Sequence, residues 1–168
     1  MTKDIILRSL VLPALLLALS NCGYSLRGSD VLSANFSEMQ FYSDQANSEL
    51  NRLLRRSLDG ADVNVTLITL DEVDANIAML GIENEQLTSR PLTINPRARA
   101  AQIELRLSVD MALILGEKNI LEPETLFVER SYFQDIENIS GNQEESEIIS
   151  TEMRRELINQ IMRRLAAL

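Results

Sequence analysis

Apolar residues recur at every second position along one segment of the chain, from Ile103 to Leu115. Every odd-numbered position in this segment is apolar, which gives seven matches in a row to a period of two residues. The positions between them include Glu104, Arg106, Ser108 and Asp110. Because successive side chains of a strand point to opposite faces, the segment predicts a strand with one buried face and one wet face.

Other segments predict further strands on the same grounds. Alternating or β-branched residues occupy 38–42, 63–70, 76–88 and 125–133, and residues 116–119 supply a turn before the last of these. Gly81 indicates a bulge or bend within 76–88. Such a pattern is typical of an antiparallel sheet that buries one of its faces.

Two segments show helical spacing instead. Residues 45–59 place apolar side chains on one face, and Asp44 precedes them as a candidate cap. Residues 144–168 contain no Gly or Pro and carry an apolar stripe, with acids at the start and arginines later. The acids Glu144, Glu145 and Glu147 are therefore interpreted as the start of this helix.

The order of these elements favours an α+β fold. We expect a two-layer sandwich, in which a mainly antiparallel sheet of about four strands is covered on one face by two helices. A single domain over 36–168 holds all of these elements, with neither an internal repeat nor a second domain.

The N-terminus resembles a bacterial export signal. Lys3 and Arg8 precede a short apolar run, and the run ends before Cys22, the single cysteine of the chain. That run is too short for a membrane-spanning helix, which needs about twenty apolar residues. Leu19 to Cys22 resembles a lipobox, although Asn21 stands where a smaller residue is usual. We therefore predict a cleaved signal over 1–21, a lipid on Cys22 and a tether over 22–35; the alternative is an ordinary signal with a free thiol.

The remaining chain is acidic. The whole sequence has 16 basic and 25 acidic residues, and removal of Lys3, Arg8 and Asp4 with the signal leaves 14 and 24, a net charge of −10. Nucleic-acid binding requires a basic surface, so this charge argues against it.

Groups for catalysis are scarce in the sequence. The chain has no histidine, no Gly-rich phosphate loop and no nucleophile elbow. The acids around Asp71 and around Glu144 lack the ligand spacing of a calcium loop. We predict no catalytic residue, no metal and no cofactor, and a two-carboxylate glycosidase stays open only as the last-ranked alternative.

Four segments in chain order resemble the LptE-type lipoproteins of lipopolysaccharide transport. Residues 22–28 are similar to the start of the mature proteins of that family, and 100–109 resemble its long central strand. Residues 127–133 and 152–165 resemble its next strand and its closing helix. The resemblance implies that 36–168 are an LptE-like domain with two helices against one sheet.

The resemblance also implies a function. Proteins of this family sit in the lumen of LptD, a large β-barrel of the bacterial outer membrane, where they assist its assembly, partly plug it and bind lipopolysaccharide. It implies a lipid-anchored domain that lies in the barrel or faces the periplasm. The alternative is an envelope-spacing lipoprotein that binds peptidoglycan or another scaffold.

A local basic cluster is the candidate for lipopolysaccharide contact, because the phosphates of lipid A are anionic. Its members are Arg90, Arg97 and Arg99, which precede the best-predicted strand, and Arg106 on the polar face of that strand. The resemblance places a basic lipid-contacting residue in this loop and a lysine at the position of Phe127. The alternative is that these arginines are solvated or pair with acids inside the barrel.

Overall fold

The computed structural model describes residues 29–94, 100–135 and 138–168. These residues form three helices and five strands, which confirms the α+β class. The helices are α2 (Ser29–Asn35), α3 (Glu49–Asp59) and α4 (Ile139–Ala166). The strands are β1 (Glu38–Ser43), β2 (Asn64–Leu67), β3 (Met79–Ile94), β4 (Ala100–Leu115) and β5 (Lys118–Phe133).

The strands form one mixed sheet in the order β2-β1-β3-β4-β5. β3, β4 and β5 pair antiparallel, whereas β1 pairs parallel with both β2 and β3. The expectation of about four mainly antiparallel strands was therefore incomplete. The chain returns from β1 through α3 to β2, and such a crossover makes neighbouring strands parallel.

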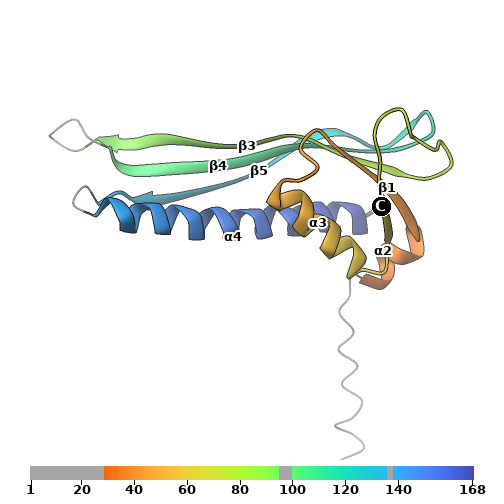
Figure 1. Cartoon of the computed structure of the whole chain (residues 1–168), viewed down its shortest axis with the longest axis horizontal. Helices are drawn as coiled ribbons and strands as arrows, with labels where there is room; N and C mark the ends of the chain where they lie inside the picture. Colours follow the sequence, from red (N-terminus) through yellow and green to blue (C-terminus); the bar gives the residue numbers. More distant parts are fainter. Residues whose placement is uncertain (1–28, 95–99, 136–137) are drawn as a thin grey trace, which may run out of the picture.

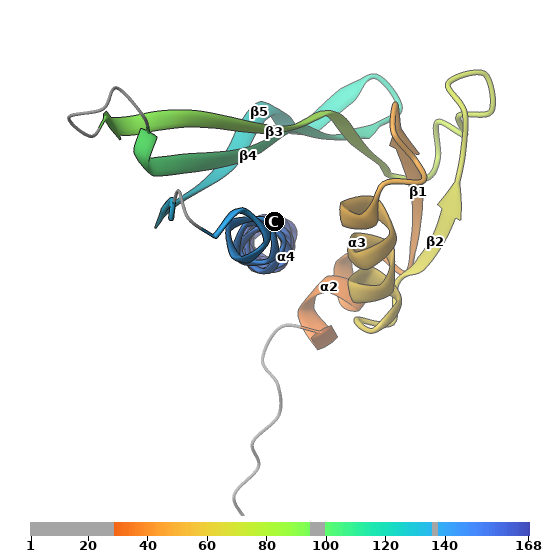
Figure 2. The ribbon, with the colours of Figure 1, turned by 60° about the vertical axis from the view of Figure 1, so that its left-hand side comes forward.

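All three helices lie on one side of this sheet. Figure 1 shows α4 running along β3, β4 and β5, with α3 and α2 gathered at the end that holds β1. Figure 2 shows that β1 and β2 bend away from the long strands, so that the sheet curves around the helices. The other face of the sheet carries no helix among the described residues.

The core lies between the helices and the inward face of the long strands. Alternate residues of β4, from Leu105 to Leu113, are buried as the periodicity predicts. They share one cluster with buried residues of α3 and α4, which are Leu50, Leu54, Leu58, Met153, Leu157, Ile158, Ile161 and Leu165. Burial of each such side chain stabilises the fold by about 1.5–3 kcal/mol.

The start of the described chain differs from the sequence expectation. Residues 29–35 form helix α2 rather than part of a tether, and Leu32 of this helix is fully buried. One buried leucine in seven residues gives no periodicity, so the sequence pattern could not reveal the helix. The rest of the predicted tether, 22–28, lies outside the described residues, as do the predicted signal and Cys22.

Both longer helices begin where a side chain caps them, and neither begins where the sequence predicted. α3 begins after Ser48, whose Oγ accepts a hydrogen bond from the N–H of Asn51 at 3.1 Å. α4 begins at Ile139, and Asn138 Oδ1 accepts from the N–H of Gly141 at 2.9 Å. The acidic group from Glu144 onward therefore lies after the first turn of α4 and does not start it.

The strands differ from expectation mainly in length. β5 already starts at Lys118, and Pro123 within it is tolerated because an edge strand leaves one side unpaired. Gly81 pairs regularly with Ala112, so the predicted bulge is not there. The register shifts instead between Glu83 and Gln86, beside Asn84, whose φ of 53° is in the left-handed region.

We predict that Gly116→Ala lowers the free energy of unfolding by about 1 kcal/mol or more. Gly116 has a φ of 59°, a left-handed conformation that costs a residue with a Cβ atom about 1 kcal/mol or more in free energy. An added Cβ would also lie 3.3 Å from the carbonyl oxygen of Ala75. Urea unfolding measures the change. Gly81→Ala is the matched control, because its Cβ would meet only Ala112 O at 3.9 Å. Equal destabilisation by both substitutions would contradict the prediction.

Candidate functional site

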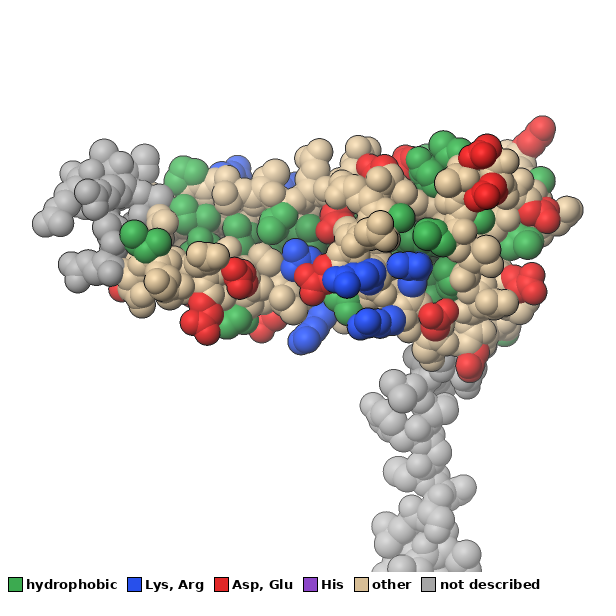
Figure 3. All heavy atoms as spheres, in the orientation of Figure 1, with side chains coloured by type: hydrophobic (Ala, Val, Ile, Leu, Met, Phe, Trp, Pro, Cys, Tyr) green, Lys and Arg blue, Asp and Glu red, His purple; other side chains and the backbone are tan. Residues whose placement is uncertain are grey.

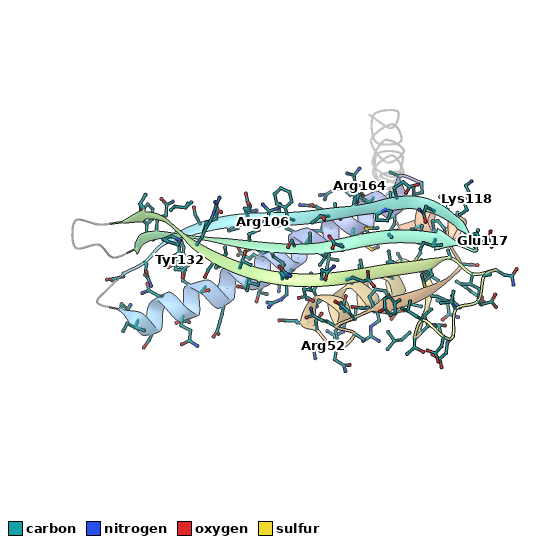
Figure 4. All side chains as sticks on the ribbon, turned by 90° about the horizontal axis from the view of Figure 1, so that it is seen from above. Arg52, Arg106, Glu117, Lys118, Tyr132 and Arg164 are labelled. Carbon is teal, nitrogen blue, oxygen red and sulfur yellow. The ribbon has the colours of Figure 1, made fainter. Side chains whose placement is uncertain are left out.

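The open face of the sheet carries the polar positions of β4. Arg106 lies at the middle of this face, opposite Thr88 of β3 and Glu129 of β5. Figure 4 looks onto this face and shows Arg106 on the middle strand. The alternation in the sequence therefore decides which side chains face away from the helices, and the strand register decides their neighbours.

Two ion pairs cross the strands on this face. Arg90 Nε lies 2.5 Å from Glu104 Oε1, and Arg106 Nη1 lies 2.7 Å from Glu129 Oε1. In each pair the register places the two residues directly opposite each other. The hydrogen bond from Arg90 to Glu104, and then the charge of Glu104, raise the pKa of Arg90 above its ordinary value. Both arginines are therefore already partnered by carboxylates.

Phe127 holds the guanidinium of Arg106 from a third side. The Cζ atom of Arg106 lies 3.9 Å from the centroid of the Phe127 ring, a cation–π contact. The ring itself is 45% exposed. At the position where the resemblance expected a lysine, the chain therefore places an aromatic ring that fixes a neighbouring arginine.

These side chains surround a shallow hollow of about 200 Å³ on the open face. Its lining residues are Thr88, Ser89, Arg90, Glu104, Arg106 and Glu129. The structure therefore brings together two of the four arginines predicted for lipid contact. Arg97 and Arg99 lie outside the described residues. Sequence reasoning missed Glu104 and Glu129, because their role depends on strand register.

A second polar network lies on the same face, nearer the bulge. Thr125 Oγ1 donates to Asp110 Oδ1 at 2.5 Å, and Asn84 Nδ2 donates to Asp110 Oδ2 at 2.8 Å. These hydrogen bonds, that of Thr125 first, lower the pKa of Asp110. The N–H of Asn84 also donates to Asp44 Oδ2 at 3.1 Å. Asp44, expected as a helix cap, thus holds the bulge of β3 in place.

A larger hollow of about 1110 Å³ lies on the helix side, between the first half of α4 and the strands β3 and β5. Apolar Leu87, Tyr132 and Ile139 contribute to its lining together with polar residues of α4. α3 is about 16 Å long, whereas each long strand extends about 53 Å. The short helix therefore leaves this end of the sheet to α4 alone, and Leu87 remains 45% exposed.

The acidic groups of the sequence take structural positions. Glu72 accepts hydrogen bonds from the backbone and hydroxyl of Thr69, and Asp74 accepts from Asn76. Within the described ranges, no cluster of three or more acidic or thiol side chains is arranged to hold a metal ion. None of the helices in the same ranges is long and apolar enough to cross a membrane.

Comparison with protein families matches residues 34–165 to LptE, a family described as lipopolysaccharide-assembly. Two curated relatives carry the name LPS-assembly lipoprotein LptE. The protein of Photorhabdus laumondii is 25% identical over 157 residues, which cover 94% of this chain and 84% of the relative. That of Pectobacterium atrosepticum is 24% identical, with 94% and 83% covered.

Solved structures share the fold. The crystal structure of rare lipoprotein B from Shewanella oneidensis superposes with a TM-score of 0.68 at 23% identity, covering 77% of this chain and 94% of that protein. The solution structure of a lipoprotein B from Nitrosomonas europaea gives a TM-score of 0.60 at 21% identity, with 86% and 91% covered. At these identities the likeness concerns the fold alone.

We predict that Thr125→Val raises the pKa of Asp110 and makes the folded state less stable at neutral pH. Because the folded pKa of Asp110 is depressed, its hydrogen bonds stabilise the fold above the ordinary aspartate pKa of about 3.9. That contribution is lost as the pH falls through the folded pKa. The difference in unfolding free energy between parent and variant should thus shrink from pH 7 to pH 3, measured by urea unfolding. Thr125→Ser keeps the donor and should behave as the parent; a difference that grows toward acid would refute this prediction.

Proposed function

This chain belongs to the LptE family of lipopolysaccharide-assembly proteins, and on that premise we propose its role in full. It is an outer-membrane lipoprotein that plugs an LptD-type β-barrel, assists the assembly of that barrel and binds lipopolysaccharide on its way to the outer leaflet. The role is one of binding, without catalysis.

The open sheet face is the observation that carries this proposal. It is long and polar. Arg90 is neutralised by Glu104 and Arg106 by Glu129, while the carboxylate of Asp110 accepts hydrogen bonds from Thr125 and Asn84. The interior of an outer-membrane barrel is polar, so such a face can lie inside it with these charged groups paired or hydrogen-bonded.

In each of these pairs of arginine and glutamate, a lipid phosphate can replace the glutamate as the anion bound to the arginine. Arginine presents a planar fork that donates two parallel hydrogen bonds to a phosphate. Arg90 is the more accessible cation, with a side chain 69% exposed, while Phe127 offers an apolar ring beside Arg106. An exposed ion pair contributes at most about 1 kcal/mol, so a lipid phosphate can displace Glu104 or Glu129 at little cost. Arg97 and Arg99 extend this site in the proposal.

The anchor completes the proposed role. Removal of 1–21 leaves Cys22 as the first residue, and several acyl chains there hold the domain to the outer membrane, since each buried methylene contributes about 0.8 kcal/mol. The domain then lies in the barrel lumen or faces the periplasm. The competing role, an envelope-spacing lipoprotein on peptidoglycan or another scaffold, requires no barrel.

We expect the double variant Arg90→Glu, Arg106→Glu to bind lipopolysaccharide at least about ten-fold more weakly than the parent. Two charge-assisted hydrogen bonds are lost, and each contributes about 1.5–3 kcal/mol. Binding of labelled lipopolysaccharide to the purified chain measures this loss. Arg130→Glu is the control, because it breaks an equivalent pair with Glu156 on the helix side. Equal losses in the two variants would move the lipid site off the open face.

Purification from detergent tests the barrel and the anchor together. We expect a stoichiometric complex with a large β-barrel from both the parent and Cys22→Ser, because the barrel itself holds the domain. Mass spectrometry should find acyl chains only on the parent. Sedimentation with the cell wall in the absence of a barrel would support the spacing role instead, and an unmodified N-terminal cysteine in the parent would contradict the anchor.

A further inference from the structure

We propose that the surface formed by α3 and α4 docks onto the anionic phospholipid headgroups of the leaflet that carries the lipid anchor. This inference rests on the proposed lipidation of Cys22. Its residues are Arg52, Arg55 and Arg56 of α3 and Arg155 of α4, called the helix-face arginines below. They lie apart from the open sheet face, on the side of the molecule that the helices cover.

The helix-face arginines differ from other arginines of the protein in having no carboxylate partner. Within the part of the chain that the structure describes, none of the four takes part in an ion pair. Arg90, Arg106, Arg130 and Arg164, by contrast, each contact a glutamate. Arg52, Arg56 and Arg155 are exposed, and Arg55 is half-buried with an Nε atom that has no hydrogen-bond partner. On a chain with a net charge of −9, this concentration of unpaired cations favours an anionic partner outside the chain.

Two of these arginines meet at a hollow between the helices. The hollow has a volume of about 210 Å³, and Arg56 and Arg155 line it together with Leu53 and Ile158. Figure 3 shows basic side chains gathered over α3 and the adjoining part of α4. Nearby, Arg154 Nη1 forms an ion pair with Glu49 Oε2 at 3.2 Å. The acid at the start of α3 therefore does not neutralise the helix-face arginines. A cationic pair beside apolar side chains suits a phosphate at the boundary between water and acyl chains.

The position of the anchor selects a membrane as the partner. Six residues separate Cys22 from Ser29, the first residue of α2, and the seven residue-to-residue steps span at most about 25 Å. Figures 1 and 2 agree that α2 lies beside α3, on the helix side of the sheet. Since α3 is only about 16 Å long, a membrane that holds Cys22 lies within reach of the arginines of α3. The tether thus raises the local concentration of headgroups next to the unpaired arginines.

Arginine is also suited to this partner by its chemistry. Each cation near an anionic lipid surface strengthens binding roughly five-fold, and the attraction falls off within a Debye length of about 10 Å. Four such residues on one face therefore bind to a charged leaflet and release it at high salt. Docking in this manner would orient the domain, with its long strands directed away from the tethered end.

The test uses the processed chain, residues 22–168, with Cys22→Ser so that no acyl chain contributes to binding. All described helices and strands lie within this chain. The helix-face variant carries Arg52→Gln, Arg56→Gln and Arg155→Gln. The control variant carries Lys118→Gln, Arg130→Gln and Arg164→Gln and has the same net charge. Figure 4 shows Arg52 on the opposite edge of the molecule from Arg164 and Lys118.

Co-sedimentation with vesicles of phosphatidylglycerol and phosphatidylcholine measures the binding. We expect the parent and the control variant to bind these vesicles and the helix-face variant to bind about 100-fold more weakly, with all binding lost at high salt. Absence of binding by the parent, equal binding to vesicles of phosphatidylcholine alone, or equal losses in the two variants overturns the proposal.

Purification of the lipidated variants with the barrel separates this inference from the proposed function. We expect the helix-face variant to keep its barrel complex, because its substitutions leave the open sheet face unchanged. Loss of that complex with unchanged vesicle binding would assign the helix face to the barrel and overturn docking on lipid. An intact barrel complex without any vesicle binding by the parent ends this inference and leaves the proposed function standing.

Discussion

The inward side chains of β4 lie against the buried stripe of α4, and the arrangement of the whole domain depends on this contact. Leu105 to Leu113 contribute alternate side chains from the strand, and Met153 to Leu165 contribute theirs at helical spacing. Neither element can bury its apolar side alone, so each supplies the cover that the other requires. Because a shift of one residue would turn the apolar side of β4 outward, this contact also fixes the register of β3 and β5.

The fixed register decides which charged side chains lie opposite each other on the outward side of the sheet. Arg106 must lie opposite Glu129, and Arg90 opposite Glu104. On the open face, each of these two arginines is consequently paired with a glutamate of the neighbouring strand. The helix side differs, since the outward positions of α3 and α4 face no strand that could supply carboxylates. The same packing contact therefore produces two surfaces, one with neutralised arginines and one with unpaired arginines.

The lengths of the elements add a second constraint. The three long strands have 16 residues each, whereas α3 has 11 residues. A helix of that length covers only the end of the sheet that also holds β1, and α4 runs alone beneath the rest. The hollow beside Leu87 and Tyr132 results from this mismatch. It adjoins the loop end of the long strands, which is the end farthest from α2 (Figure 1).

The sequence by itself determined the elements whose residues repeat with a period. The alternation from Ile103 to Leu115 and the stripe from Ile149 to Leu165 identified β4 and α4, and Arg106 was correctly assigned to the polar side. The sequence pattern did not predict α2, because one buried leucine has no period. It did not predict the parallel pairing of β1 either, because pairing partners lie far apart in the chain. Only the tertiary structure decided which carboxylate neutralises each arginine and which arginines stay unpaired. These outcomes depend on strand register and helix packing, which bring distant residues together and leave no local pattern in the sequence.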